Sequence, residues 1–171
     1  GLGDQDSRGD GAGEMGDALP AGSLGAGRTA QAVAAGDAHT CAILDDATLR
    51  CWGSGDDGRL GSGGIDTIGD DADEAPVAVS LGSGRSAVAV ALGESHACVL
   101  LDDASARCWG NGASGRLGSG GVSPRGDEAG EMGDALAAVA LGTGRTARAV
   151  AAGDAHTCAV LDDATMKCWG S

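Results

Sequence analysis

The chain has 171 residues, with 25 acidic and 11 basic side chains and a formal net charge of −14 at pH 7. A surface of this charge repels nucleic acids and anionic membranes, so the composition argues against a protein that binds DNA or RNA. No run of about 18 apolar residues occurs, and we therefore expect no membrane insertion. Phe and Tyr are absent whereas Gly occurs 33 times, so a core must be built from small aliphatic side chains at close packing.

The first predicted element is an acidic, glycine-rich loop at residues 8–19, RGDGAGEMGDAL. Similar acidic segments follow at 69–79 and 125–136. Their charges and glycines indicate solvated loops between the strands.

A β-hairpin is predicted next, at residues 39–53, HTCAILDDATLRCWG. Asp45 and Asp46 lie between two apolar runs, where aspartate favours a turn. Folding the chain back at Asp46 places Cys41 opposite Cys51. The first of the two strands is apolar on both faces, and such a strand must be covered on both. We therefore expect sheets that pack face to face.

The same hairpin returns at residues 96–110 and 156–170, so the chain repeats one unit three times. In the second copy, four short apolar runs separated by Gly or Asp are predicted to be strands. These runs are residues 76–81, 86–92, 96–101 and 105–110. Repeats of this size, with four antiparallel strands each, are typical of propeller blades, so the predicted class is all-β. The predicted units are residues 1–58, 59–115 and 116–171.

The six cysteines form three local pairs in this prediction, because directly opposed residues of a hairpin lie within disulfide range. The predicted disulfides are Cys41–Cys51, Cys98–Cys108 and Cys158–Cys168. Paired cysteines with none left over are typical of proteins outside the reducing cytosol, so we expect a secreted, extracellular protein. The alternative is a zinc site made by His39, Cys41 and Cys51, although this spacing matches no common zinc motif.

The repeated phrase resembles the repeat of the RCC1 family, the regulator of chromosome condensation. The resemblance rests on a Gly-x-x-His turn, an Asp-Gly turn, a Trp-Gly pair and a Gly-Gln-Leu-Gly close. This chain departs from the pattern in two places, with Asp-Asp at the turn and Arg in place of Gln. In the first copy these are Gly36 with His39, Asp45-Asp46, Trp52-Gly53 and Gly58-Arg59-Leu60-Gly61. The resemblance implies RCC1-like blades that form part of a β-propeller. Because nuclear members lack the cysteine pairs, the chain is most similar to secreted, disulfide-containing members. No catalytic residue is carried over, and we expect no enzymatic activity.

One histidine and one tryptophan recur in each unit. We interpret the histidines as turn residues that bond to neighbouring backbone, with ligand binding as the alternative. We expect the tryptophans to pack between neighbouring sheets, with a sugar-binding platform as the alternative. These residues are His39, His96, His156, Trp52, Trp109 and Trp169.

Acidic loops outside the cell can also hold calcium, although the spacing here fits no EF-hand. We expect no other cofactor. The candidate calcium ligands are Asp10, Glu14, Asp17, Asp127, Glu131 and Asp134.

Three copies are fewer than the blades of most closed propellers, and open sheet edges invite pairing with other chains. We therefore expect part of a larger propeller, or an open superhelical or filamentous array. The expected function is structural assembly outside the cell, with further blades or other copies of the chain as partners. The alternatives are a secreted propeller that binds or inhibits a protein partner, and an RCC1-type guanine nucleotide exchange factor, which would require reduced thiols.

Overall fold

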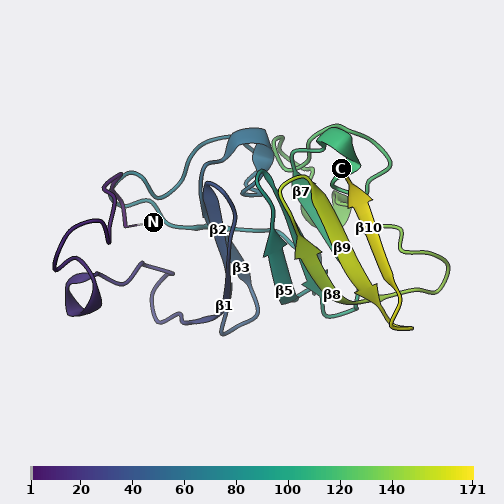
Figure 1. Cartoon of the computed structure of the whole chain (residues 1–171), viewed down its shortest axis with the longest axis horizontal. Coiled ribbons are helices and arrows are strands. Elements are labelled where there is room, and N and C mark those ends of the chain that lie inside the picture. The colour runs from purple at the N-terminus through teal and green to yellow at the C-terminus, as the bar shows by residue number, and fades with distance from the viewer. Residues whose placement is uncertain (1) are drawn as a thin grey trace.

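The computed structural model describes residues 2–171, and Gly1 of the predicted first unit lies outside them. Three antiparallel β-sheets stand face to face in chain order, and the N-terminal segment extends beyond the first of them (Figure 1). The first sheet has the order β1-β2-β3-β4, the second β5-β6-β7 and the third β10-β9-β8. This arrangement confirms the predicted all-β class with blade-like antiparallel sheets.

The strands are short and alternate with turns and loops. The first sheet comprises β1 (Ala30–Ala35), β2 (His39–Leu44), β3 (Leu49–Gly53) and β4 (Val77–Ala78). The second comprises β5 (Ala87–Leu92), β6 (His96–Leu101) and β7 (Ala106–Gly110), and the third β8 (Ala147–Ala152), β9 (His156–Leu161) and β10 (Met166–Gly170). Single turns of 3-10 helix lie in the loops: η1 (Gly16–Ala18), η2 (Asp56–Gly58), η3 (Ala113–Gly115) and η4 (Gly133–Ala135). No helix within residues 2–171 is long and apolar enough to cross a membrane.

The double aspartate builds the hairpin turn between β2 and β3. Asp46 accepts hydrogen bonds from the backbone N–H and the hydroxyl of Thr48, at 3.1 and 2.6 Å. Ala47 between them takes a left-handed φ of 59°. The same side-chain bonds close the turns of the other two hairpins. The turn sets the register in which Cys41 lies opposite Cys51.

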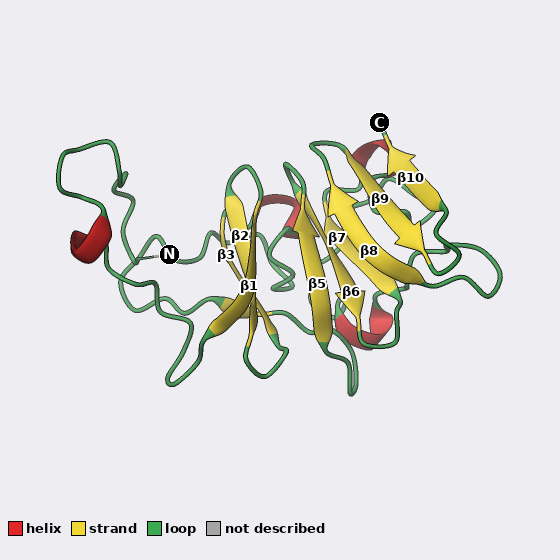
Figure 2. Ribbon diagram, turned by 60° about the horizontal axis from the view of Figure 1, so that its bottom comes forward, coloured by secondary structure: helices red, strands yellow, loops and turns green. Residues whose placement is uncertain are grey.

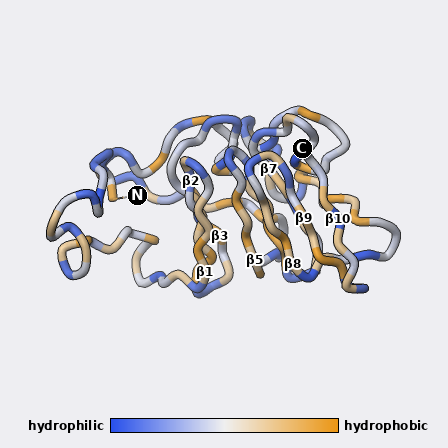
Figure 3. Tube along the Cα trace, viewed as in Figure 1, coloured by the Kyte–Doolittle hydropathy of each residue, from blue (hydrophilic) through white to orange (hydrophobic). Residues whose placement is uncertain are grey.

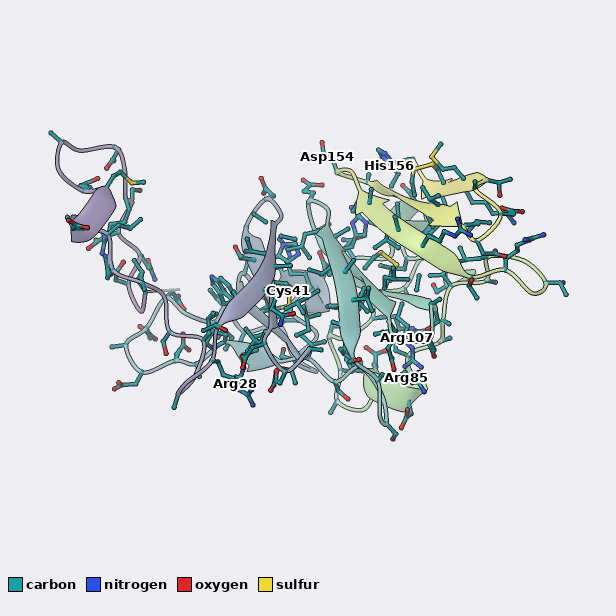
Figure 4. All side chains as sticks on the ribbon, turned by 90° about the horizontal axis from the view of Figure 1, so that it is seen from below. Arg28, Cys41, Arg85, Arg107, Asp154 and His156 are labelled. Atoms are coloured by element: carbon teal, nitrogen blue, oxygen red, sulfur yellow. A yellow bond between two sulfur atoms is a disulfide. The ribbon has the colours of Figure 1, made fainter. Side chains whose placement is uncertain are left out.

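Each aspartate turn also faces an arginine from the loop before it. The guanidinium of Arg28 lies 2.6 Å from the Asp46 carboxylate, and Arg85 lies at the same end of the second sheet (Figure 4). Exposed ion pairs of this kind contribute little stability in water. The turns therefore depend mainly on their hydrogen bonds.

Each sheet has two different faces, which we name after their characteristic residues. The cysteine face of the first sheet carries His39, Cys41, Ile43, Leu49 and Cys51, and its tryptophan face carries Thr40, Ala42, Leu44 and Trp52. The three sheets are stacked one after another (Figure 2). The cysteine face of the first sheet packs on the tryptophan face of the second, and the cysteine face of the second packs on the tryptophan face of the third. Thus Cys41 and Ile43 pack in one cluster with Val99 and Trp109, while Leu100 packs with Leu161 in the next.

The two ends of this stack carry faces that no neighbouring sheet covers. β6 is buried at every position, whereas β9 is exposed at His156 and Val160 on its cysteine face. Apolar residues concentrate in the strands of all three sheets, including those at the ends (Figure 3). The cysteine face of the third sheet is therefore exposed. On the tryptophan face of the first sheet Val33 is exposed, whereas Ala42 and Leu44 are buried although no neighbouring sheet covers them.

The grouping of strands differs from the sequence-based prediction by one strand. The run 76–81 was expected to join the second sheet, because it lies in the predicted unit 59–115. In the structure β4 pairs with β3 of the first sheet, and the Val79 N–H donates to the Leu49 carbonyl at 3.0 Å. The second sheet receives the equivalent bond at its edge, from the Val139 N–H to the Ala106 carbonyl at 2.8 Å. The first and second sheets are thus each completed by residues from beyond the predicted unit boundary.

Candidate functional site

Three disulfides lie on the cysteine faces, one in each sheet. They join Cys41 to Cys51, Cys98 to Cys108 and Cys158 to Cys168, each between directly opposed residues with a Cα–Cα distance of 4.1 Å. The first two are buried between sheets, whereas Cys168 of the third is exposed. Because Cys41 and Cys51 are bonded to each other in a disulfide, the zinc site of His39, Cys41 and Cys51 is ruled out in this state. Across residues 2–171, no group of three or more His, Cys, Asp or Glu side chains is placed to hold a metal.

The histidine of the second sheet makes a hydrogen-bonded link to the third sheet. His96 Nε2 lies 2.9 Å from the Thr157 hydroxyl oxygen, and that hydroxyl donates to the Arg116 carbonyl at 3.0 Å. Since the single hydroxyl proton is used there, His96 Nε2 must be the donor in the first bond. The partner of His96 is therefore a side chain of the neighbouring sheet, and the sequence-based interpretation of a bond to local backbone is wrong for this residue.

The equivalent histidine of the first sheet lacks such a partner. His39 is buried, and both of its ring nitrogens are without a hydrogen bond. Ala97 occupies the position in the second sheet that Thr157 occupies in the third. A buried polar group without a partner costs about 1–3 kcal/mol, so the first interface is the weaker of the two.

Restoring the missing hydroxyl should strengthen the first interface. We expect Ala97→Thr to raise the free energy of unfolding by about 1 kcal/mol, because the new hydroxyl would link His39 to the Arg59 carbonyl. The reverse change, Thr157→Ala, should lower it by about 1–3 kcal/mol, since it leaves His96 Nε2 unpaired. Urea unfolding measures both values. A destabilised Ala97→Thr variant would contradict this assignment.

The buried histidines also predict a pH dependence of stability. Burial lowers the pKa of both His39 and His96 from 6.5 to about 4, and the neighbouring charges of Arg59 and Arg116 act in the same direction. The unfolded chain therefore binds more protons than the folded chain between these values. Stability should be fully present above pH 6.5 and fall towards pH 4, by on the order of 2 kcal/mol for each histidine.

Urea unfolding at a series of pH values checks this expectation. The interval from pH 6.5 to 5 is the informative one, because carboxylates titrate mainly below it. A variant with His39→Gln and His96→Gln should lose the slope in that interval. An unchanged slope in the variant would assign the effect to other groups.

The tryptophans form a second line of contacts between sheets. Trp109 is fully buried, and its indole N–H donates to the Arg59 carbonyl at 3.1 Å. Trp169 makes the equivalent bond to the Arg116 carbonyl at 2.9 Å. Trp52 is half-buried on the tryptophan face of the first sheet. A fully buried ring cannot stack on a sugar, so Trp109 does not form a binding platform.

The candidate calcium ligands are spread over two loops at separate places. Asp10, Glu14 and Asp17 lie in the N-terminal segment, and Asp127, Glu131 and Asp134 lie between β7 and β8. Glu14 accepts backbone N–H bonds from Gly9 and Gly11 at 2.8 and 2.9 Å. These bonds hold the pKa of the Glu14 carboxyl below its usual range. Glu131 makes similar bonds within its own loop, and calcium binding stays a prediction.

Asp134 makes a contact that the sequence did not suggest. Its carboxylate accepts hydrogen bonds from the Ser83 backbone and hydroxyl, at 2.9 and 2.5 Å. Ser83 precedes β5, so this bond ties the loop before the third sheet to the segment before the second sheet. The two residues are 51 positions apart, and only the stacking of the units brings them together.

The arrangement offers one exposed sheet face, the cysteine face of the third sheet, with apolar, hydrogen-bonding and disulfide groups like those of the cysteine faces that are buried inside the stack. Comparisons with known proteins show which families share this architecture. Two models of the regulator of chromosome condensation (RCC1) repeat match the chain, one at residues 30–59, 87–116 and 147–171 and the other at 48–100. Together they cover about two thirds of the chain. A search of curated proteins finds no match.

Solved structures share the fold at low sequence identity. Human WBSCR16 is 20% identical with a TM-score of 0.67, over 82% of this chain and 33% of that one. Prp20p from Saccharomyces cerevisiae is 20% identical with a TM-score of 0.60, over 85% and 31%. The ectodomain of the receptor kinase CR4 from Physcomitrella patens is 18% identical with a TM-score of 0.50, over 84% and 30%.

The chain spans about a third of the length of each of these proteins. The matched repeats, together with the fold that they form, show that the chain belongs to the RCC1 repeat family.

Proposed function

We propose that the chain is a non-enzymatic assembly module that works outside the reducing cytosol and binds protein through the ends of its stack of sheets. The observation that carries this proposal is the free cysteine face of the third sheet. Val160 on this face is 39% exposed, whereas its equivalents Ile43 and Leu100 are 3% and 5% exposed beneath the next sheet. An exposed apolar face of this kind is typical of an interaction surface, whether a further blade of the same polypeptide or another chain covers it.

The extracellular part of the proposal rests on the disulfides. Three disulfides and no free cysteine among the described residues are typical of secreted proteins. The similarity in fold to a receptor-kinase ectodomain is compatible with this location. The acidic surface favours solubility at high concentration and basic rather than acidic partners.

A second candidate function is binding of an unrelated protein by a closed propeller. Prp20p, which shares the fold, is described with binding properties to Gsp1p and histones. That observation supports protein binding as a use of this fold, and nucleotide exchange is the least supported candidate because no residue of this chain is matched to it. The two leading candidates differ in whether stacks of sheets continue from chain to chain.

Electron microscopy of the native particle separates them. Extended fibres, or rings made of several chains, would support the assembly role. Isolated single-chain particles at every concentration would contradict it and favour the binding role. The carboxymethylated, fully reduced chain is the control, and it should form neither kind of particle.

A further inference from the structure

We propose that Asn111 is a site of spontaneous deamidation, and that its contact with Asp57 controls how fast this modification proceeds. The reaction needs water but no enzyme. It turns a neutral hydrogen-bond donor at the interface between the first and second sheets into a carboxylate. The inference concerns the chemistry of the chain itself and does not depend on the proposed assembly role.

The dipeptide Asn111-Gly112 is the chemical basis of the proposal. Asn111 is the only asparagine of the chain, and the glycine after it has no Cβ to shield its backbone nitrogen. In deamidation this nitrogen attacks the side-chain carbon Cγ of the asparagine and closes a five-membered succinimide ring. The bond from Cγ to Nδ2 breaks, and the proton lost by the Gly112 nitrogen passes through water to Nδ2, which leaves as ammonia. Water then opens the ring to aspartate or isoaspartate.

The fold requires glycine at position 112. A Cβ on Gly112 would overlap the Ser123 carbonyl oxygen, and a Cβ on Gly55, the equivalent residue of the first unit, would overlap a backbone carbonyl in the same way. The glycine half of the dipeptide is therefore fixed by packing. The residue before it varies, since it is serine at position 54 and asparagine at position 111. Only the second unit therefore carries the reactive pair.

The backbone around Asn111 favours the attack. Oδ1 of Asn111 accepts a hydrogen bond from the Ala113 N–H at 2.8 Å. This N–H stabilises the negative charge that develops on Oδ1 when the ring closes. Within residues 2–171 the Gly112 N–H donates no hydrogen bond to a protein group, so no such bond has to break before this nitrogen reacts.

Asp57 acts in the opposite direction. Nδ2 of Asn111 donates to Asp57 Oδ2 at 2.9 Å, and hydrogen bonds to a carboxylate are stronger than those between neutral groups. Asp57 lies in η2 after β3, whereas Asn111 follows β7, so the bond joins the first sheet to the second. It opposes the movement of Cγ towards the Gly112 nitrogen, and an ionised carboxylate gives Nδ2 no proton. The contact therefore slows the reaction.

Deamidation turns this attraction into repulsion. Aspartate or isoaspartate at position 111 places a second carboxylate beside Asp57, and like charges at this distance repel. Arg59 offers little relief, because its guanidinium already lies 3.9 and 3.8 Å from the carboxylates of Asp56 and Asp57. The same interface contains the unpaired ring of His39. The modification therefore loosens the contact between the first and second sheets irreversibly.

Incubation of the folded wild-type chain at mildly alkaline pH tests the proposal. Alkaline conditions help because the Gly112 nitrogen must lose its proton. Peptide mapping by mass spectrometry should find OH in place of NH2 at residue 111, with aspartate and isoaspartate peptides in separate chromatographic peaks. Asn111→Ser should abolish both products. It should fold normally, because the first unit has serine there and the Ser54 hydroxyl accepts the Asp56 N–H at 3.3 Å.

Asp57→Ser tests the role of the contact. The second unit has serine at the equivalent position, and Ser114 adopts a φ of 58° against 57° for Asp57, so the backbone accepts the change. The rate of deamidation should rise about fivefold, the factor that corresponds to a net hydrogen-bond contribution of about 1 kcal/mol. Asp56→Ala is the matched control, because it removes a carboxylate from the same loop but leaves the bond to Asn111 in place.

The chain unfolded in urea completes the experiment. There the wild type, Asp57→Ser and Asp56→Ala should all react at one rate, because the contact exists only in the folded chain. Separately, Asn111→Asp should lower the midpoint of urea unfolding relative to Asn111→Ser, and adding Asp57→Ser should restore much of the loss.

Two results would overturn the inference. One is an Asn111 that stays unmodified in both the wild type and Asp57→Ser. The other is a folded Asp57→Ser chain that reacts no faster than Asp56→Ala.

Discussion

Replacing Trp109 with alanine is expected to lower the free energy of unfolding by about 3–5 kcal/mol, the range for removing a fully buried aromatic side chain. The indole fills the space between the first and second sheets and donates to the Arg59 carbonyl. Its loss leaves a cavity and an unpaired carbonyl at once. Urea unfolding followed by far-ultraviolet circular dichroism measures the change without relying on the deleted fluorophore.

Trp52→Ala is the matched control for this prediction. Trp52 has the same place in its hairpin, but it is half-buried because no sheet within residues 2–171 packs on it. We expect a loss of about 1–2 kcal/mol, in proportion to the smaller area that it removes from water. Equal losses for the two variants would show that stacking of sheets does not determine the stability of the tryptophan position.

Replacing both Cys98 and Cys108 with alanine should be the other strongly destabilising change. The two residues are ten positions apart, and closing a loop of this size is worth about 3 kcal/mol in the chain-entropy model. Both sulfurs are also packed in the core between the second and third sheets. Their removal should add about 1 kcal/mol for the space left behind.

The double replacement of Cys158 and Cys168 separates these two contributions. It opens a loop of the same length, but Cys168 is exposed on the free face. The loss should therefore be close to the entropic part alone, about 3 kcal/mol. A larger loss here than for the central pair would contradict the stacking order of the sheets.

Local features of the fold could be predicted from the sequence because the residues of each hairpin determine its turn and its register. The double aspartate between two apolar runs predicts a turn at Asp46, and the structure pairs Cys41 with Cys51 about that turn. The runs that are apolar on both sides predict stacked sheets, and β6 is buried throughout. In these hairpins the period of the apolar pattern and the position of the turn determine the register of the strands and the face on which each side chain lies.

The sheet to which β4 belongs could not be predicted in this way. The run 76–81 is apolar and lies between two hairpins, so its pattern is the same whichever sheet it joins. A repeat in sequence defines a period but not the point at which one sheet ends. β4 has only two paired residues, and its partner is set by the path of the chain between the sheets.

The differences in burial and hydrogen bonding between the three histidines could not be predicted from the sequence either. His39, His96 and His156 stand in nearly identical phrases, yet one is unpaired, one bonds Thr157 and one is exposed. The deciding residue is the one after the histidine of the next unit, which is Ala97 in one case and Thr157 in the other. This residue is present in the sequence, but its role can be inferred only once the order in which the sheets stack is known.

Alkylation of the native chain tests most directly the central claim that stacked sheets are each closed by a disulfide outside the reducing cytosol. Intact mass spectrometry after treatment with iodoacetamide should find no added group on the unfolded, unreduced chain. After reduction, all six cysteines should be modified. Modification of the unreduced chain at these positions would show free thiols and would contradict the account.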